Sequence, residues 1–341
     1  MLTAESVKKA ANGFGADLCG IASMDRFEGA PKQQDPRYIF PDAKACIVLG
    51  FRIPRGYFRG IEEGTYFVGY CGMGYGALNL VYMPVVMREL CCFIEDEGWE
   101  AAPVPNMYMG SSIDIVNQRY EPRRSRPTRP GLPSPDVLVD IRVAAFAAGL
   151  GEFGYSKMFL TPQFGPAQRL VAVLTDAPLE PDPIFEGKIC DRCMRCVAEC
   201  SGKAISAQET ERITVAGRTV EWGKLDVVKC SVAYRGGNPD YNPFLQPSAA
   251  GDMDAYWKEY AGGAVLGKHI NYGSVDLHNP ALEGARGCIR ACMAHLEEKG
   301  VLTKKFNNRF RKRKPWRLAS FGDDGWAGFS EGREAKVRDT E

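Results

Sequence analysis

The sequence predicts a mixed fold of helices and strands, of the α/β or α+β class, followed by a smaller cysteine-rich region. Two stretches, residues 3–14 and 77–97, repeat apolar residues at helical spacing. Short apolar runs bounded by glycine and proline, such as residues 44–53, are typical of buried strands. Four cysteines follow within residues 190–200. We therefore expect a packed core first and a metal or redox unit after it.

The chain is predicted to open with one helix and two strands. Thr3 is expected to cap the helix, because Val7 and Phe14 mark an apolar face that ends at the following glycines. Residues 17–22 and 44–53 are expected to form buried strands.

The next elements alternate between loop and regular structure. Residues 55–76 are rich in glycine and tyrosine and predict an irregular loop. Residues 77–97 predict a helix, in which Pro84 either makes a kink or marks the true first turn. Residues 99–104 predict a strand, and residues 117–135, with five arginines among prolines, predict a long surface loop.

The remaining core elements follow in order. Residues 136–148 predict a helix that starts near Asp136, and residues 157–161 and 169–175 predict strands. Residues 211–222 alternate about an Ala-Gly pair, which predicts a hairpin.

Composition restricts the class of protein. A chain of 341 residues suggests two domains, or one large domain with insertions. The net charge of +1 excludes a surface that coats polyanions generally, although a local basic patch remains open. No apolar run reaches the roughly 18 residues of a membrane span, and no export signal is visible, so we expect a cytoplasmic protein. Twelve cysteines in that compartment favour metal or redox chemistry over disulfides.

The spacing C-x2-C-x2-C-x3-C predicts an iron–sulfur cluster. Three thiolates of a tight loop can hold one four-iron cluster, while the fourth points towards a second cluster. Zinc sites instead separate their cysteine pairs by a dozen or more residues. The motif consists of Cys190, Cys193, Cys196 and Cys200.

A second set of cysteines completes the pattern only in part. By the crossed ligation rule, Cys292 joins the first three cysteines of the motif, and Cys200, Cys230 and Cys288 hold the second cluster. Ala285 stands where a regular second motif would have its fourth thiolate. The second cluster is therefore either a three-iron cluster or a four-iron cluster with a non-cysteine or remote ligand.

The other cysteines lack ligand spacing. Cys19, Cys46 and Cys91 lie in apolar segments and are expected to be small buried hydrophobic residues. Cys71 lies in the glycine- and tyrosine-rich stretch, where a ligand or reactive role remains an alternative to packing.

An ordered set of motifs resembles one protein superfamily. The sequence AGLGE at 148–152, the segment LTPxFGPxxRL at 160–170 and TDxPL at 175–179 lead into the cysteine motif. Upstream, GADLCGIAS, FPDAKACIVLGFR and EDEGWEAAPVPN extend the set. Over roughly residues 14–230 the chain resembles the cobalamin-dependent reductive dehalogenases and their relatives, the epoxyqueuosine reductases.

The resemblance implies a nitroreductase-like core that binds base-off cobalamin and a ferredoxin-like iron–sulfur module packed against it. We expect the core at residues 1–185, the iron–sulfur region at 186–300 with an insertion at 231–287, and a basic tail at 301–341. The GLGE sequence favours the dehalogenase side. The catalytic Asp-Thr-Ala-Pro stretch of the queuosine enzymes and their C-terminal helical repeats are absent, whereas a respiratory dehalogenase would carry an export signal and a complete second cysteine set.

The same resemblance suggests catalytic residues. Dehalogenases use a tyrosine with a basic partner as proton donor, and Tyr75, just before the predicted helix, fits that role. Asp136 is the rival donor because it lies near the position of the queuosine enzymes' acid, and Arg142 is a candidate cation facing the pocket. The structural alternatives are a packed aromatic ring for Tyr75, a helix cap for Asp136 and a surface ion pair for Arg142.

Further residues are candidates for cofactor contacts. Tyr155 and Lys157 follow the turn that is expected to approach the corrin. The arginines of residues 117–135 either meet the cobalamin phosphate, steer an anionic substrate or are solvated. One of the three histidines, His269, His278 and His295, could supply the missing cluster ligand.

Three functions remain open at this point. The chain is an oxidoreductase that cleaves a carbon–halogen or other carbon–heteroatom bond of a small molecule, a tRNA-modifying reductase of the queuosine type, or a non-catalytic electron-transfer or corrinoid-handling protein. The basic run at 304–316 could bind RNA, dock an acidic ferredoxin or flavodoxin, or be a solvated tail.

Overall fold

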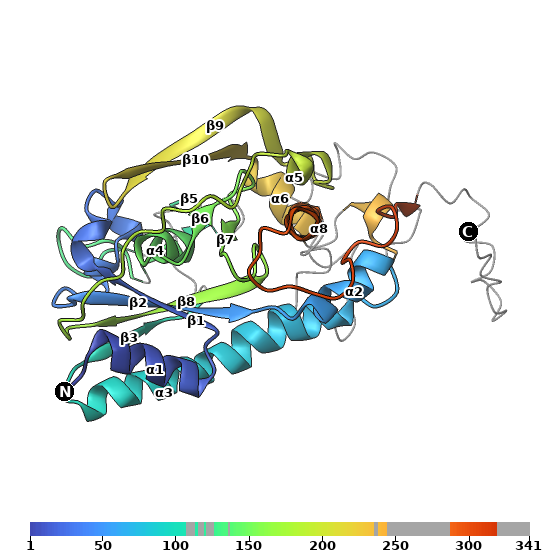
Figure 1. Cartoon of the computed structure of the whole chain (residues 1–341). Coiled ribbons are helices and arrows are strands. Elements are labelled where there is room, and N and C mark those ends of the chain that lie inside the picture. Colours follow the sequence, from blue (N-terminus) through green and yellow to red (C-terminus); the bar gives the residue numbers. More distant parts are fainter. Residues whose placement is uncertain are drawn as a thin grey trace, which may run out of the picture.

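The structure is a computed structural model that describes residues 1–106, 113–114, 119–120, 126–135, 137–234, 238–243 and 287–318 (Figure 1). Asp136, His269, His278 and Ala285 lie outside the described residues. The described part mixes helices and strands, which confirms the predicted class at that level. The nitroreductase-like core, the ferredoxin-like module and the division into three regions stay predictions.

An antiparallel sheet of four strands forms the centre of the described fold. Its strands stand in the order β1 (Leu18–Ser23), β2 (Ala45–Arg52), β8 (Gln168–Thr175) and β3 (Ala101–Val104). Each strand pairs antiparallel with its neighbour. All four coincide with runs that the sequence predicts as strands.

Alternation along β2 divides the core into two layers. Ile47 points into one apolar cluster, whereas Cys46 and Val48 point into the other. In register, Ile47 lies between Ile21 of β1 and Val173 of β8, and all three are fully buried. Burying such an aliphatic side chain contributes about 1.5–3 kcal/mol, so the sheet is stabilised from both faces.

Helices and a hairpin cover the two faces of the sheet. Helices α1 (Ala4–Phe14) and α3 (Met83–Asp96) lie on one side, as Figure 1 shows. Helix α4 (Ile141–Ala147) and the hairpin of β9 (Ile205–Val215) and β10 (Arg218–Leu225) lie on the other. The predicted hairpin is thus confirmed, with longer strands.

Besides α2 and η4, which are described below, the other elements are short except for α6 and α8. They are η1 (Met24–Phe27), η2 (Lys32–Gln34), η3 (Pro36–Tyr38), β4 (Ile113–Asp114), β5 (Arg119–Tyr120), β6 (Glu152–Phe153), β7 (Phe159–Leu160), α5 (Arg195–Ala198), α6 (Val227–Tyr234), η5 (Pro239–Tyr241) and α8 (Cys288–Lys299).

Side-chain caps decide where two helices begin. Thr3 accepts a hydrogen bond from the Ser6 backbone N–H at 3.1 Å, as the sequence predicts for the first helix. Helix α4 begins only at Ile141, because the Asp140 carboxylate accepts the N–H of Arg142 at 3.0 Å. The predicted start near residue 136 was therefore too early.

The predicted loop at residues 55–76 was wrong. Residues 55–63 form α2 (Arg55–Glu63), and a π-helix, η4 (Gly69–Tyr82), follows. Close packing explains the glycines, because a Cβ on Gly60 would lie 1.8 Å from the carbonyl oxygen of Tyr66. A small residue typical of loops here lets the turn that follows α2 pack closely against the helix.

Helix η4 runs directly into α3, and Pro84 lies in the first turn of α3, one of the two predicted alternatives. The continuous helix Gly69–Asp96 is long and apolar enough, by length and composition, to cross a membrane. The expectation that no segment reaches that length and apolarity was therefore wrong. A third of its most apolar window is buried against the core, and a core helix passes the same test.

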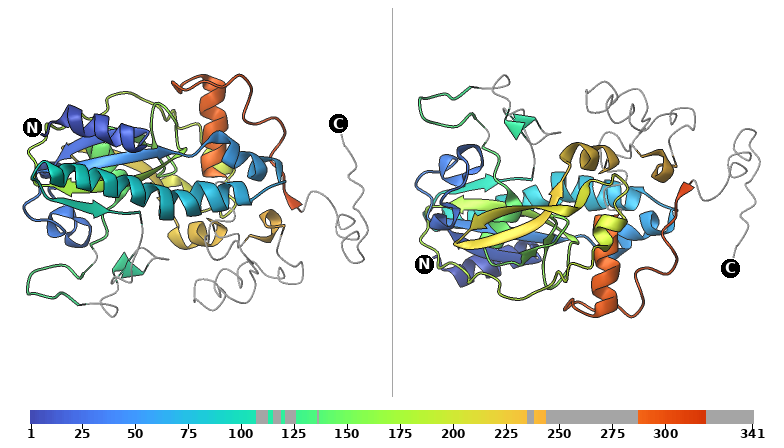
Figure 2. Two further views of the ribbon diagram at one scale, coloured as in Figure 1. Left: turned by 90° about the horizontal axis from the view of Figure 1, so that it is seen from below. Right: turned by 90° about the horizontal axis from the view of Figure 1, so that it is seen from above.

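The described part of the basic C-terminal run is folded onto the body. Phe310 is buried in the core, and the Trp316 indole N–H donates to the carbonyl of Ile61 on α2 at 2.8 Å. Figure 2 shows this segment passing from α8 towards α2. These contacts anchor the segment, while residues 304–309 and 312–315 remain exposed, so most of its basic side chains are solvated.

Candidate metal centre and cofactor cavity

Three chain segments bring the seven predicted metal-ligating cysteines together. The chain reverses sharply at Arg192 and Met194, whose φ angles are 56° and 60°, and then enters α5, which packs on α8. The first segment carries Cys190, Cys193, Cys196 and Cys200, α6 carries Cys230, and α8 carries Cys288 and Cys292.

Cys190, Cys193, Cys196 and Cys292 form what we name the first thiol group. Burial raises the pKa of the Cys292 thiol well above its usual range, and the charges of Cys190, Cys196 and Cys193 raise it further. Burial also raises the pKa of Cys196 to about 12, with the same neighbours adding to the effect. Cys193 is the exposed member of the group.

Cys200, Cys230 and Cys288 form the second thiol group. Burial raises the pKa of Cys230 to about 11, and the charge of Cys200 adds to it. The pKa of Cys288 is raised by burial and then by Cys230, Cys200 and Cys196, so the two groups are neighbours. No fourth cysteine joins this group in the part of the chain that the structure describes.

The chemistry of these donors fits iron–sulfur clusters. Thiolates are the ligands of such clusters, and a bound metal deprotonates a coordinating thiol outright. The structure gathers the cysteines of both predicted ligand sets in one region, and their roles as ligands stay predictions.

Backbone and carboxylate contacts hold the start of the cysteine loop. One Glu152 oxygen accepts the N–H groups of Ile189 at 2.7 Å and Cys190 at 2.6 Å. The Tyr155 N–H donates to the Cys190 sulfur at 3.4 Å. Gly151 is required beside Glu152, because a Cβ there would lie 2.0 Å from the carbonyl oxygen of Leu160. The AGLGE sequence therefore positions the first thiol group.

An acid–histidine pair adjoins the first thiol group, and sequence reasoning missed it. The His295 Nε2 lies 2.9 Å from both carboxylate oxygens of Asp191, and the two residues and Cys193 have ligand atoms within 4.8 Å of one another. The hydrogen bond to His295 lowers the pKa of Asp191 to about 2. His295 thus stands beside the first group, not beside the incomplete second group.

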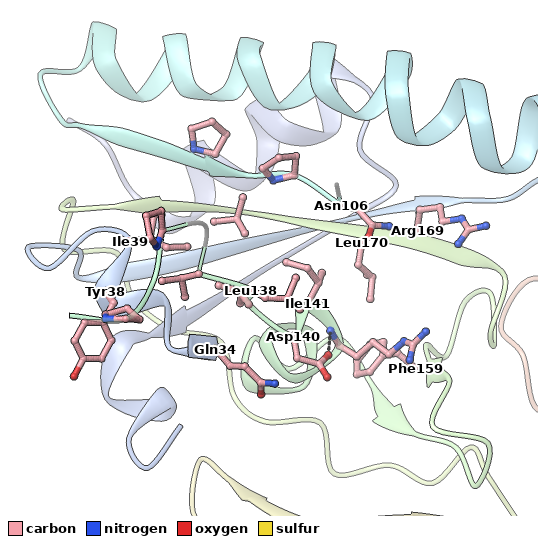
Figure 3. A pocket seen from close by; sticks show the side chains of 18 of the residues that line it. Gln34, Tyr38, Ile39, Asn106, Leu138, Asp140, Ile141, Phe159, Arg169 and Leu170 are labelled. Atoms are coloured by element: carbon pink, nitrogen blue, oxygen red, sulfur yellow. Dashed lines mark hydrogen bonds between the residues drawn. The ribbon is translucent and has the colours of Figure 1, made fainter. Parts of the chain in front are cut away.

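A cavity of about 630 Å³ lies between the edge of the sheet and residues 128–142 (Figure 3). Leu138, Ile141 and Leu170 give it an apolar wall, and its lining includes the cations Arg142 and Lys157. The charge of Arg142 also lowers the pKa of both Cys230 and Cys288. Met158 also lines the cavity and packs against the same apolar cluster as Cys190 and Cys292, so the cavity adjoins the first thiol group.

The cavity fits a corrinoid by its chemistry. Cofactor pockets usually measure about 300–1,000 Å³ and combine apolar walls with a few polar groups. The apolar wall suits a macrocycle, and Arg142 and Lys157 suit an anionic phosphate.

The two residues predicted to contact the cofactor, Lys157 and Tyr155, lie in different surroundings. Lys157 lines the cavity, with a φ of 63° and its Nζ 5.0 Å from the ring of Trp222. Tyr155 does not line it. The Tyr155 side chain packs with Cys196 and donates its hydroxyl to the Ser206 carbonyl at 3.1 Å, so it supports the thiol groups. Among the loop arginines, Arg126 and Arg129 are exposed.

A tyrosine–arginine cluster lies behind the cavity wall. Arg169 lines the cavity, donates to the Tyr70 hydroxyl at 2.6 Å, and places its guanidinium carbon 4.7 Å from the ring centroid of Tyr75. Tyr75 meets Tyr234 edge-on at 5.7 Å. Burial raises the pKa of Tyr70, although the charge of Arg169 opposes it.

This cluster gives Tyr75 a basic partner that sequence reasoning did not identify. The signal was Arg169 in the segment LTPxFGPxxRL. Tyr75 itself does not line the described part of the cavity.

Cysteines outside the two groups take part in packing. Cys46 is fully buried on β2, and burial raises its pKa to about 12, as expected for a small hydrophobic residue. Cys19 and Cys91 pack against the core with partial exposure. Cys71 is fully buried in η4.

Curated relatives confirm the resemblance that the sequence indicates. The tetrachloroethene reductive dehalogenase of Sulfurospirillum multivorans is 34% identical over 143 residues, which make up 40% of this chain and 24% of that protein. No family model matches the chain. Because the match spans about a quarter of the relative, the activity of that enzyme comes to this chain only as a proposal.

Solved structures give two weaker likenesses. A catabolic reductive dehalogenase in complex with 3-bromo-4-hydroxybenzoic acid shares 16% identity at a TM-score of 0.47, over 92% of this chain and 39% of the other. An epoxyqueuosine reductase with a tRNA stem loop shares 15% identity at a TM-score of 0.42, over 87% and 82%.

Proposed function

We propose that this chain is a corrinoid- and iron–sulfur-dependent oxidoreductase that reductively cleaves a carbon–halogen or other carbon–heteroatom bond of a small molecule. One observation carries the proposal. Met158 lines the cavity and packs against the same apolar cluster as Cys190 and Cys292 of the first thiol group. The proposed redox site and a cofactor-sized cavity are therefore neighbours.

The proposed ligands define the route of electrons. Cys190, the exposed Cys193, Cys196 and Cys292 would hold one cluster near the surface, and the second thiol group would hold another. When bound, the clusters pass single electrons and the corrinoid supplies low-potential cobalt chemistry that no side chain offers. Arg142 and Lys157 would bind and orient the cofactor's anionic groups.

The protein residues must also supply a proton. Replacing a halogen by hydrogen consumes two electrons and one proton, breaks the carbon–halogen bond and releases halide. We assign the donor role to Tyr75, with Arg169 stabilising the phenolate that remains. Arg169 keeps its charge: burial would lower its pKa, but the hydroxyls of Tyr70, Tyr234 and Tyr75 raise it overall.

Turnover tests the proposal directly. The protein is purified anaerobically, reconstituted with iron, sulfide and cobalamin, and incubated with a low-potential reductant and a halogenated phenol. We expect halide release that requires both cobalamin and intact clusters. If the clusters are reduced while no halide is released and an aryl ether offered in parallel is not cleaved, the protein is only an electron carrier and the proposal is overturned.

A further inference from the structure

We propose that the surface around Cys193 docks an acidic one-electron carrier protein of the ferredoxin or flavodoxin class. This inference rests on the proposed cluster in the first thiol group. It locates the entrance for electrons, which the proposed function leaves open.

Cys193 differs from the other cysteines of the two thiol groups in its exposure to solvent. Among the seven cysteines of the two thiol groups, Cys193 is classed as exposed, whereas the others are half-buried or buried. Cys193 directly follows the tight turn at Arg192 and precedes α5, which lies above α8 at one end of the hairpin (Figure 1). A cluster held there would present one corner to a partner.

Positive charge surrounds this corner. Arg192, Arg195 and Lys299 keep 54%, 42% and 57% of their side-chain surface exposed. Their carboxylate partners are shared, since Glu221 serves both Arg192 and Arg212 and Asp191 serves both Lys299 and His295. The patch consists of the cations Lys188, Arg192, Arg195, Arg212 and Lys299 and the carboxylates Asp191, Glu221, Glu298 and the half-buried Glu152. Cations therefore outnumber carboxylates by one.

The mixture of charges favours a protein over a nucleic acid. Carboxylates placed among the arginines would repel a phosphate backbone, whereas an acidic protein can pair with the cations and set its own basic groups against Asp191 or Glu298. Part of the basic run at 304–316 is used internally, because Arg311 pairs with Glu62 and Glu199. The patch around Cys193 is therefore the better docking surface.

The reaction at this surface is the transfer of one electron. The reduced carrier gives up one electron and is oxidised by one unit, and the cluster in the first thiol group accepts that electron. No proton or bond changes in this step. Complementary charge would raise the rate of encounter about 10- to 1,000-fold, with a steep dependence on ionic strength.

Stopped-flow reduction of the reconstituted clusters tests the docking surface. Cluster bleaching is followed at low ionic strength with two reductants, a reduced acidic ferredoxin and the cationic methyl viologen radical. For Arg195→Glu we expect bleaching by ferredoxin to slow about tenfold, with that difference shrinking at about 0.15 M salt, while bleaching by viologen stays equal or becomes faster. Glu298→Gln should speed the reaction with ferredoxin.

Two variants serve as controls. Arg88→Glu changes an exposed arginine on α3, on the far side of the sheet from the hairpin (Figure 1), and should leave both rates unchanged. Arg195→Glu combined with Glu298→Arg restores the net charge of the patch and should recover most of the ferredoxin rate. Iron per chain is measured for every variant.

Three results would overturn the docking surface. The first is that Arg195→Glu and wild type are reduced by ferredoxin at equal rates. The second is that Arg195→Glu is slowed equally with ferredoxin and with viologen. The third is that the protein binds a tRNA stem loop, and that Arg195→Glu abolishes this binding without changing the rate of reduction by ferredoxin. Viologen-driven halide release is independent of this surface, so it shows separately whether the proposed function holds.

Discussion

At the scale of single residues, accessibility decides which thiol is most easily tested. Cys193 is exposed, whereas Cys196 retains 8% of its surface. Both belong to the first thiol group. A change at Cys193 therefore alters a ligand without opening the core.

We predict that Cys193→Ser loses the cluster of the first thiol group. A serine hydroxyl is a harder ligand than a thiolate and suits iron–sulfur clusters poorly. After anaerobic reconstitution, iron per chain should fall by about half, because one of two clusters is lost, and visible absorption should fall with it. Cys92→Ser on α3 is the matched control and should keep the wild-type values. A Cys193→Ser protein with full iron content would contradict the ligand assignment.

Tyr75 provides the test of the proton donor. Tyr75→Phe removes the hydroxyl but keeps the ring that Arg169 covers, so kcat should fall about 10²- to 10⁴-fold while KM and iron content stay constant. Tyr82→Phe, whose hydroxyl donates to the carbonyl of Gly15 at 3.1 Å, is the control. Unchanged turnover by Tyr75→Phe would exclude Tyr75 as the donor.

The sequence could predict residues whose chemistry depends on local spacing. The cysteine motif lies within eleven residues, and its spacing alone indicates the ligands. Arg169 could not be found in this way, because it meets Tyr70 across 99 residues. The same holds for His295 and Asp191, which are 104 residues apart and pair only in the folded chain.

At the scale of elements, the turn after α4 connects the core to the cysteine loop. Gly149 and Gly151 let the backbone pass close to Pro183 and Leu160, where a Cβ would lie 2.1 Å and 2.0 Å from the respective carbonyl oxygens. Glu152 follows and accepts two N–H groups at the start of the loop. The turn and Glu152 therefore act as a clamp, in the sense that they hold the start of the cysteine loop, and with it the first thiol group, against the core.

Glu152→Leu tests this clamp. Loss of the acceptor frees the N–H groups of Ile189 and Cys190, and bleaching of the clusters by a chelator should become about 10- to 100-fold faster, the usual effect of removing a group that orients a metal ligand. Glu152→Gln keeps one acceptor oxygen and should bleach at nearly the wild-type rate. If Glu152→Leu also bleaches at that rate, the loop does not depend on the carboxylate.

Elements with local signals were predictable, and those shaped by packing were not. The helix capped by Thr3 and the hairpin turning at Ala216 and Gly217, with φ angles of 50° and 72°, follow from nearby residues. Residues 55–76 have the composition of a loop, yet Tyr70 stacks on Phe58 with ring centroids 5.3 Å apart and draws the segment into helices. Tertiary contacts decided that segment.

At the scale of the whole molecule, a buried ion network joins distant segments. The Glu62 carboxylate on α2 pairs with Arg290 on α8 and with Arg311 of the C-terminal segment. Arg311 also pairs with Glu199, just before Cys200, at 2.7 Å. Glu62 and Arg290 retain 3% and 2% of their side-chain exposure, so this network fixes the C-terminal segment next to the cysteine region.

Removing Glu62 should destabilise the fold strongly. Glu62→Gln leaves two buried cations without a shared carboxylate, which typically costs about 3–5 kcal/mol. Chemical denaturation of the apoprotein should show this loss as a lower free energy of unfolding. Glu63→Gln affects the neighbouring carboxylate, whose partners Arg59 and Arg313 are more exposed, and should cost at most about 1 kcal/mol. Equal stability of the two variants would contradict the network's role.

The sequence indicated a core followed by a cysteine region, but it did not show how the C-terminal run packs. In the sequence, Arg311 is one of many basic residues at 304–316. Its burial depends on Glu62, which is 249 residues away. Long-range pairing of charge leaves no local pattern.

The central claim is that a corrinoid binds in the cavity beside the two thiol groups. Its most direct test is gel filtration of the cluster-loaded protein with excess hydroxocobalamin, followed by the corrinoid absorption of the protein peak. We expect about one corrinoid per chain, as for one cofactor-sized cavity. The double variant Arg142→Gln, Lys157→Gln should retain less corrinoid than the wild type. A protein peak with full iron content and no corrinoid would contradict the binding of a corrinoid in this cavity.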